Sequence, residues 1–272
     1  MKKEHPMSHS FDMWQTIRTE VESAAREEPM LASFLHLTVL RHESLARVLA
    51  FHLSSKLSGS TMDARALYET FLRVLEHNPH IAQAVERDIA ACYDRDPACD
   101  AYSLPLLYFK GFHAIQTHRI NHALWQDGRK TLAYFLQNRA SEVFGVDIHP
   151  GAKFGCGIMF DHGTGIVIGE TAVLGDDISL LHGVTLGGSG KESGDRHPKI
   201  GNGVMIGANA SVLGNIYIGD RAKIGAGSVV VRDVEPQTTV VGVPAKAVGL
   251  SRNTPSADMD QSLLCDDFVF MI

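Results

Sequence analysis

The chain has 272 residues, which is enough for one large domain or two of moderate size. Its formal net charge is −6 and it has no basic stripe, so nucleic acid is not expected as a partner. It has neither the run of about 18 apolar residues that a membrane span needs nor an apolar stretch behind the charged amino terminus, so we expect no membrane span and no signal peptide. Four scattered cysteines lack the spacing of a disulfide framework or a zinc ribbon, which predicts a reduced, cytoplasmic protein.

Residues 1–144 are predicted to form an all-α domain. Leu67, Phe71 and Leu75 fall on one helical face, and Asn78-Pro79 ends that helix and begins the next one. That next helix is expected to end near Asp96, because the residue before a proline is disfavoured in the helical region. Two further helices are expected over about 105–126 and 131–141.

From residue 145 to 246 the period of the sequence changes to six. A hydrophobic residue returns about every six positions, and a glycine or another small residue usually follows it. This period fits neither a helix nor a half-buried strand; it is typical of the hexapeptide repeat of a parallel β-helix. Each hexad is expected to form one short strand whose hydrophobic residue points into a prism, with three strands to a triangular coil. The hydrophobic positions are Ile148, Phe154, Phe160, Ile168, Leu174, Leu180, Leu186, Ile200, Ile206, Val212, Ile218, Ile224 and Val230.

The six-residue period is broken twice. Phe160 and Ile168 lie eight residues apart, and Leu186 and Ile200 lie fourteen apart. A regular prism has no reason to break its period, and both extra segments carry histidine and charge. We therefore expect the chemistry of the protein at these two breaks.

The end of the chain is predicted to be a flexible tail, residues 247–272. Pro244 is expected to stop further β pairing, and the composition is then polar as far as Asp260. The last five residues, 268–272, are apolar. This apolar end has two interpretations, a strand folded back on the body or a ligand for another protein.

The stretch from Phe109 to Lys246 resembles the bacterial serine O-acetyltransferases. The motifs that carry the resemblance are Val146 to Pro150, Asp161 to Thr171, Gly183 to Gly188, Gly190 to Ile200, and Val241 to Lys246. The resemblance implies a two-domain α+β fold, in which an N-terminal all-α helical domain precedes a left-handed parallel β-helix of hexapeptide repeats and a flexible C-terminal tail. The activity that it implies is transfer of acetyl from acetyl-CoA to the hydroxyl of L-serine, with L-cysteine as feedback inhibitor and no metal.

The reaction needs a base, because an alcohol is a poor nucleophile at neutral pH, and imidazole suits that task best. His162 lies in the first break beside Asp161 and aligns with the catalytic base of the family. The alternative is that His162 has only a structural role in the wall of the prism. The resemblance assigns Asp147 to orienting His162. Asp147 comes fifteen residues earlier, close to one eighteen-residue coil, so we expect it to stack beneath the ring.

Serine is a zwitterion, so its site needs a cation for the carboxylate and an anion for the ammonium. Arg196 offers a bidentate fork with His197 beside it, while Asp161 and Asp96 are the candidates for the ammonium. The resemblance implies that cysteine binds the same groups. It also places the coenzyme along a prism edge, on Gly187, Gly188, Ala208 and Ala226, with Lys223 and Lys246 near the phosphates. The sequence assigns no role to His149, His182 or Glu170.

Other functions stay open at this point. Related prism enzymes acetylate homoserine, sugars or xenobiotics, and some carbonic anhydrases bind zinc on the same prism through three histidines. A scaffold without catalysis would leave the two period breaks unexplained. The resemblance further implies a homotrimer, or a hexamer made of two trimers. It also implies that the C-terminal Ile272 binds O-acetylserine sulfhydrylase.

Overall fold

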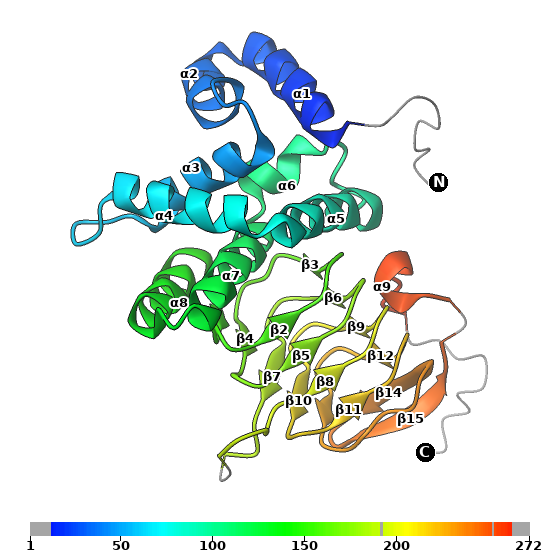
Figure 1. The fold of residues 1–272 in the computed structure, drawn as a ribbon. Helices are drawn as coiled ribbons and strands as arrows, with labels where there is room; N and C mark the ends of the chain where they lie inside the picture. Colours follow the sequence, from blue (N-terminus) through cyan, green and yellow to red (C-terminus); the bar gives the residue numbers. More distant parts are fainter. Residues whose placement is uncertain (1–11, 191–192, 252, 263–272) are drawn as a thin grey trace. The chain divides into compact units, whose positions relative to one another are not determined.

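The computed structural model describes residues 12–190, 193–251 and 253–262 (Figure 1). The chain divides into two compact units, Met1–Phe144 and Gly145–Ile272. Ile272 and the rest of the apolar end lie outside the described residues.

The first unit is built of helices. In chain order they are α1 (Met13–Glu27), the 3-10 turn η1 (Pro29–Leu31), α2 (Ala32–Leu35), the π-helical turn η2 (His36–Leu40), α3 (Leu45–Leu57), α4 (Ala64–His77), α5 (Pro79–Arg95), α6 (Ser103–Tyr108), α7 (Lys110–Gln126) and α8 (Lys130–Phe144).

Helices α4 and α5 follow the sequence closely. Asp63 caps the start of α4 by accepting hydrogen bonds from the backbone N–H groups of Arg65 and Ala66. The predicted apolar face is buried, including Leu67, Phe71 and Leu75. Helix α5 begins at Pro79 and ends at Arg95, so both proline signals are confirmed.

The single helix expected over 105–126 is instead two, because the chain is extended at Phe109 between α6 and α7. The break leaves carbonyl groups of α6 without helical partners, and two buried histidines form hydrogen bonds with them. His113 Nε2 lies 2.8 Å from the carbonyl oxygen of Leu106, and His52 Nε2 lies 3.3 Å from that of Leu107. A carbonyl only accepts, so both rings carry hydrogen on Nε2.

A buried ion pair joins α5 to α7. The guanidinium of Arg119 donates from Nε and Nη2 to the two carboxylate oxygens of Asp88, at 2.9 and 3.0 Å. Gln116 Nε2 donates to the same carboxylate at 2.8 Å. The Asp88 side chain is completely buried, so these donors replace the water that the charge has lost.

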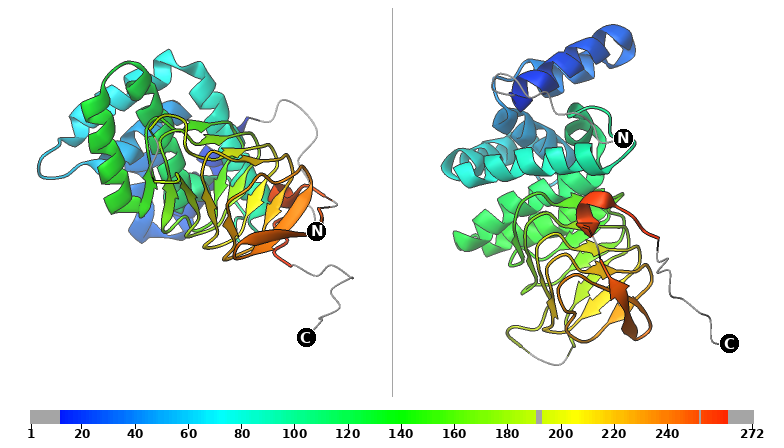
Figure 2. Two further views of the ribbon diagram at one scale, coloured as in Figure 1. Left: turned by 90° about the horizontal axis from the view of Figure 1, so that it is seen from below. Right: turned by 90° about the vertical axis from the view of Figure 1, so that its right-hand side faces the viewer.

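The second unit is a triangular prism of three sheets, whose strands pair in parallel except for the last strand of the third sheet (Figures 1 and 2). The first sheet orders β1 (Val146–Ile148), β4 (Ile166–Ile168), β7 (Thr185–Gly187), β10 (Ser211–Leu213) and β13 (Val229–Val230). The second orders β2 (Lys153–Phe154), β5 (Val173–Leu174), β8 (Lys199–Ile200) and β11 (Tyr217–Ile218). The third orders β3 (Met159–Phe160), β6 (Ser179–Leu180), β9 (Met205–Ile206), β12 (Lys223–Ile224), β14 (Thr238–Gly242) and β15 (Ala245–Leu250).

The predicted hexads form this prism. Twelve of the thirteen hydrophobic positions are buried, and Phe154 is half-buried. The residue two positions earlier also points inward in most coils, as Ile158, Ile178 and Ala210 show. Alternate residues of an extended chain share a face, so most hexads supply two core residues, one just before the strand and one within it, where the pattern indicated one.

The strand pairing shows how the two period breaks lengthen individual coils. Val167 pairs with Thr185, 18 residues later, which is one regular coil. Across the first break Val146 pairs with Ile166, 20 residues later, and across the second Val173 pairs with Lys199, 26 later. The inserted residues therefore leave the wall between strands without disturbing the stacking of the coils.

Along one prism edge, side chains form hydrogen bonds to the backbone of the preceding coil. Asp176 Oδ1 accepts from the backbone N–H of Cys156, Asn202 Oδ1 from Asp176, and Asp220 Oδ1 from Asn202, at 2.7 to 2.8 Å. Each acceptor sits where a Cβ on the glycine of the previous coil would lie, so that glycine has no room for a side chain; at Gly201 the gap to Asp220 Oδ1 would be 2.4 Å.

The end of the prism differs from the expectation in one respect. Strand pairing continues past Pro244, because β14 turns back into antiparallel β15 and Pro244 occupies the turn, where no ladder donor is needed. Helix α9 (Pro255–Asp258) follows and lies against the third sheet, where Ser179 Oγ donates to the carbonyl oxygen of Ser256 at 2.8 Å.

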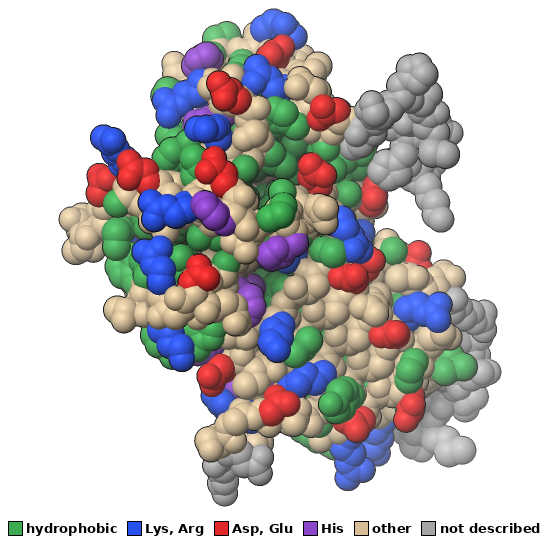
Figure 3. Space-filling model, viewed as in Figure 1, with side chains coloured by type: hydrophobic (Ala, Val, Ile, Leu, Met, Phe, Trp, Pro, Cys, Tyr) green, Lys and Arg blue, Asp and Glu red, His purple; other side chains and the backbone are tan. Residues whose placement is uncertain are grey.

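Acidic and basic side chains are interspersed on the face of the helical unit drawn in Figure 3. In the ranges that the structure describes, no helix is both long enough and apolar enough to cross a bilayer.

Candidate active site

His162 occupies one edge of the prism, between the third sheet and the first. The equivalent corner positions of the next coils are His182, Ala208 and Ala226; we call this row the His162 edge. Its coils are joined by backbone bonds, from Gly183 N to the carbonyl of Thr164 and from Gly227 N to that of Ala208, each at 2.8 Å.

The backbone of His162 is strained, with φ at 56° followed by 72° at Gly163. A left-handed conformation is uncommon outside glycine and clusters at functional sites. The turn pushes the imidazole outward, so the side chain is 76 % exposed. Its Nε2 lies 3.8 Å from Asp161 Oδ1, and its ring centroid lies 6.2 Å from that of His182. The ring is thus presented to solvent, as the first period break predicted.

A second set of polar groups occupies the next edge, between the first and second sheets. Here His149, Glu170 and Gly188 follow the strands of successive coils; we call this row the His197 edge, because the segment 194–197 packs over it. Arg196 Nη2 donates to Glu170 Oε2 at 2.9 Å, and Arg196 Nη1 donates to the carbonyl oxygen of Gly194 at 3.0 Å. The hydrogen bond from Arg196 lowers the pKa of the Glu170 carboxyl, which stays ionised.

Thr171 ties His197 to this edge. The Thr171 hydroxyl oxygen accepts the backbone N–H groups of Arg196 and His197, at 3.0 and 3.1 Å. His197 Nδ1 lies 2.9 Å from the same oxygen and 3.2 Å from the Thr171 backbone nitrogen. His197 is only 6 % exposed, and this burial, with Arg196 adjacent, lowers the pKa of its imidazole.

Two glycines make room for the His197 ring. A Cβ on Gly169 would lie 2.0 Å from both Cδ2 and Nε2 of the imidazole, and one on Gly188 would lie 3.4 Å from Nε2. The ring therefore lies flat over the Gly169 backbone in space that any side chain there would fill. Gly188, predicted for the coenzyme, lines this cluster as well.

The predicted residues fall on both edges of one wall. His162 precedes strand β4 and Glu170 follows it, so at least the length of that three-residue strand, about 10 Å, separates them. Within the described part of the chain, His162 and His197 make no contact with each other. A single prism thus divides the predicted base from the predicted carboxylate site.

Asp147 lies in the middle of the same wall, in β1. Its register partner is Val167, so the stacking beneath His162 that the fifteen-residue spacing implied does not follow from the register. Asp147 also acts electrostatically on His149, where it raises the pKa against the larger lowering effect of burial. Its role in orienting His162 stays a prediction.

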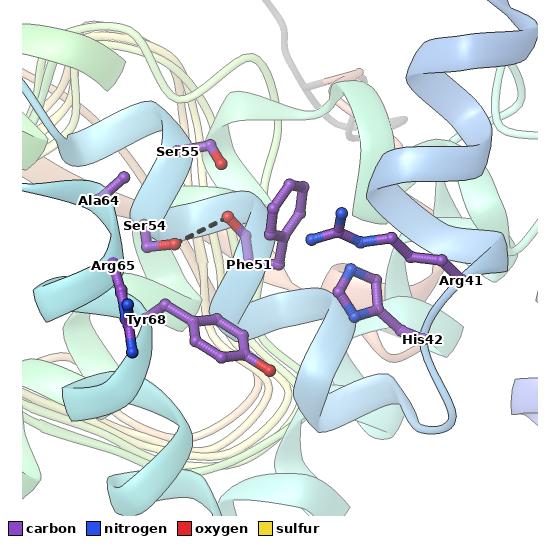
Figure 4. Close-up of a pocket in the computed structure, with 8 residues that line it drawn as sticks. All are labelled: Arg41, His42, Phe51, Ser54, Ser55, Ala64, Arg65 and Tyr68. Atoms are coloured by element: carbon purple, nitrogen blue, oxygen red, sulfur yellow. Dashed lines mark hydrogen bonds between the residues drawn. The ribbon is translucent and has the colours of Figure 1, made fainter.

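Asp96 belongs to the first unit, where it ends α5 and accepts the backbone N–H of Ala98 at 2.8 Å. Its proposed contact with the serine ammonium stays a prediction. The first unit also contains a pocket of about 410 Å³ that the sequence did not indicate (Figure 4). Arg41 stacks over Phe51 at 4.6 Å there, with His42 beside it, and none of the predicted site residues lines it.

Comparison with known proteins decides the family. The profile "Serine acetyltransferase, N-terminal" matches residues 13–117, and "Bacterial transferase hexapeptide (six repeats)" matches residues 197–232. The serine acetyltransferase of Neisseria gonorrhoeae, solved in complex with serine, is 70 % identical, with a TM-score of 0.87 over 91 % of this chain and 100 % of that one. The chain belongs to the serine acetyltransferase family.

Two other solved members carry different ligands. A serine acetyltransferase in complex with cysteine is 53 % identical, with a TM-score of 0.92 over 93 % of this chain and 99 % of that one. The enzyme from Brucella abortus, in complex with coenzyme A, is 50 % identical, with a TM-score of 0.87 over 89 % and 97 %. Among the described residues of the present chain, no group of three or more His, Cys, Asp or Glu side chains is placed to hold a metal ion.

The residues predicted for the coenzyme are spread over both edges. Ala208 and Ala226 lie on the His162 edge, one coil apart, and Gly187 and Gly188 lie on the His197 edge. Lys223 is nearly buried in β12, where its ammonium donates to the carbonyl oxygen of Ser262 at 2.6 Å and lies 3.9 Å from Asp260. Lys246 is exposed on β15 and pairs with Val241.

Sequence reasoning missed Thr171 and left Glu170 without a role. Both were detectable from the register: once the second break is counted as eight extra residues, position 170 falls beside 196 and position 171 beside 197. The observed pairs Glu170–Arg196 and Thr171–His197 are both 26 residues apart.

Proposed function

We propose that this chain transfers the acetyl group of acetyl-CoA to the hydroxyl of L-serine, giving O-acetyl-L-serine and CoA. Membership of the serine acetyltransferase family over nearly its whole length carries this proposal. Relatives solved with serine, with coenzyme A and with cysteine support the two substrates and the inhibitor. Homoserine, sugar and xenobiotic acceptors, and the carbonic anhydrase alternative, have no counterpart among these relatives.

In the proposed mechanism His162 is the general base. Its imidazole takes the hydroxyl proton of serine as the oxygen attacks the thioester carbonyl, and it then returns a proton to the departing CoA thiolate. The exposed ring and left-handed backbone of His162 support this role. His162→Ala should lower kcat by about 10²–10⁴ without unfolding the protein. The test is release of the CoA thiol with serine, homoserine and a galactoside as acceptors. Unchanged turnover in the variant would exclude His162 as the base.

Arg196, His197 and Asp161 are proposed to bind the serine carboxylate and ammonium, with Asp96 contributing from the first unit. Cysteine shares the carboxylate and ammonium of serine, so it is proposed to compete for the same groups. Arg196→Lys keeps the charge and loses the fork, so it should weaken both serine use and cysteine inhibition. Cysteine inhibition that is non-competitive with serine and insensitive to this change would contradict a shared pocket.

The active site is proposed to lie between two prisms of a homotrimer. One chain carries His162 and the Arg196–His197 cluster on opposite edges of a wall, so a second copy is needed to bring one edge against the other. Whether two trimers pair into a hexamer is part of the same proposal. Sedimentation during turnover tests it, and an active monomer would refute it.

Two proposals concern residues or places outside the described structure. O-acetylserine sulfhydrylase is proposed as the partner of Ile272, through an apolar side chain and the terminal carboxylate. Deleting Ile272 should abolish that binding and spare acetyl transfer; a pull-down with unchanged affinity would refute it. A cytoplasmic location, expected from the scattered cysteines, also stays a proposal.

A further inference from the structure

The hydrogen bonds around His197 determine which ring nitrogen carries its proton. The Thr171 backbone N–H can only donate, and it lies 3.2 Å from His197 Nδ1. Nδ1 must therefore present a lone pair in that direction. The Thr171 hydroxyl oxygen already accepts two backbone N–H groups, from Arg196 and His197. Its own hydrogen is thus left to donate, either to His197 Nδ1 at 2.9 Å or to the carboxylate of Asp195. Hydrogen bonds with Lys199 and with the Thr171 side chain lower the pKa of that carboxyl.

With Nδ1 as acceptor, the neutral ring carries its hydrogen on Nε2. That atom has no hydrogen-bond partner among the described residues, although the side chain is only 6 % exposed. Nε2 is not among the fully buried unpaired polar atoms of the described residues, so its N–H is a donor available to a ligand. Protonation would put a second hydrogen on Nδ1, facing the backbone N–H of Thr171.

The charged groups near His197 act in both directions. Arg196 and Lys199, from its own segment, disfavour a second positive charge, whereas Glu170 from the packed coil favours it, and His149 lies on the same edge. Asp195 is engaged by Lys199, with 2.5 Å between Nζ and Oδ1. Burial and the neighbouring cations outweigh Glu170 and lower the pKa of His197, which favours the neutral ring, and the Thr171 contacts decide which nitrogen carries the hydrogen.

We propose that Thr171 is a positioning residue, which locks His197 as a neutral Nε2–H tautomer so that the ring donates a hydrogen bond to the acceptor substrate. His197 is then a donor at all working pH values, and proton acceptance falls to His162 alone. That the ligand of Nε2 is serine rests on the proposed function; the tautomer itself does not.

Magic-angle-spinning ¹⁵N NMR of the full-length protein, labelled at histidine, reads the tautomer directly. His197→Asn identifies the resonances of this ring. In the wild type at pH 7.5 we expect a pyridine-type Nδ1 and a pyrrole-type Nε2. In Thr171→Val the backbone N–H groups of Arg196 and His197 lose their acceptor, so the ring is no longer held against the Thr171 backbone N–H. The two signals should then move toward each other as both tautomers become populated. Thr171→Ser should restore the wild-type pattern.

Kinetics test the second half of the proposal. Thr171→Val should lower kcat/KM for serine about 10-fold, the effect of misplacing one hydrogen bond, while Thr171→Ser stays within about 3-fold of wild type. Thr238→Val, which removes an exposed prism hydroxyl bonded to Pro236, is the matched control and should change neither readout. If Thr171→Val merely loosened the segment 194–197, kcat/KM for serine would fall while the tautomer of His197 stayed as in the wild type.

Three results would overturn the proposal. They are a protonated or Nδ1–H ring in the wild type, a Thr171→Val spectrum identical to wild type, and an altered tautomer with unchanged serine kinetics. If Thr171→Val does not fold, the wild-type and Thr171→Ser spectra still decide the tautomer. A neutral Nε2–H ring in a protein that acetylates no serine would refute the proposed function and leave the lock intact.

Discussion

Gly169 offers the most direct test of how the prism holds His197. A Cβ at this position would lie 2.0 Å from the imidazole, whereas ordinary contact begins near 3.4 Å, so Gly169→Ala requires the ring to move by about 1.4 Å. The backbone of Gly169 is not in the left-handed region, so alanine adds no conformational strain there. A shift of that size breaks the contacts of 2.9 and 3.2 Å between His197 Nδ1 and Thr171.

The expected result of Gly169→Ala is a loss of about 10²-fold in kcat/KM for serine, because a misplacement of about 1 Å has that effect on a positioned group. Overpacking should also lower stability by about 1–3 kcal/mol, as measured by urea unfolding. Gly59→Ala is the matched control: its Cβ would lie 3.8 Å from Arg139 Nη2, an ordinary contact, so activity and stability should stay near wild type. Serine kinetics within twofold of wild type in folded Gly169→Ala would show that the position of His197 does not matter to the reaction.

Two further predictions concern the helical unit. Burial holds the pKa of His52 at about 4 and that of His113 at about 3, so the unfolded chain takes up protons below pH 6.5 that the folded chain refuses. Stability should therefore fall as the pH drops from 7.5 to 5, by about 2 kcal/mol per ring, and urea midpoints that stay flat over this range would contradict it. Arg119→Met leaves the buried Asp88 carboxylate without its main partner and should destabilise the protein by about 3–5 kcal/mol; the double variant with Asp88→Leu should recover part of this, and equal losses in both would refute the explanation.

The prism was predictable because its period is a property of each hexad. Inward positions such as Leu180 and Ile206 need only a hydrophobic residue every six positions, and the structure confirms them. The break at Phe109 was not predicted, because Pro105 and Gly111 lie within the two flanking helices and neither occupies the break itself. It depends on His113 and His52 taking the carbonyl oxygens of α6, and His52 is 55 residues away from its partner Leu107.

The candidate site shows the same division between local and long-range information. His162 stood out because the insertion around it is local, and the structure finds it exposed in a strained turn. The stacking of Asp147 was inferred from a coil of eighteen residues, but the first break lengthens that coil to 20 and puts Val167 opposite Asp147. Contacts across an insertion follow the register, and the register is known only once the inserted residues have been counted into one coil.

The proposed mechanism gives the two period breaks different roles, and the hydrogen bonds of the histidines near them differ as well. On the His197 edge the Nδ1 atoms of His149 and His197 each accept a backbone N–H, from Gly151 at 3.0 Å and from Thr171 at 3.2 Å, so both rings are held neutral with hydrogen on Nε2. His162 accepts no such bond among the described residues, and its ring is exposed to solvent. A prism is well suited to this separation, because its stacked coils hold each edge rigid. In the proposed mechanism the long insertion supplies the groups that bind the serine carboxylate, and the short one supplies the base.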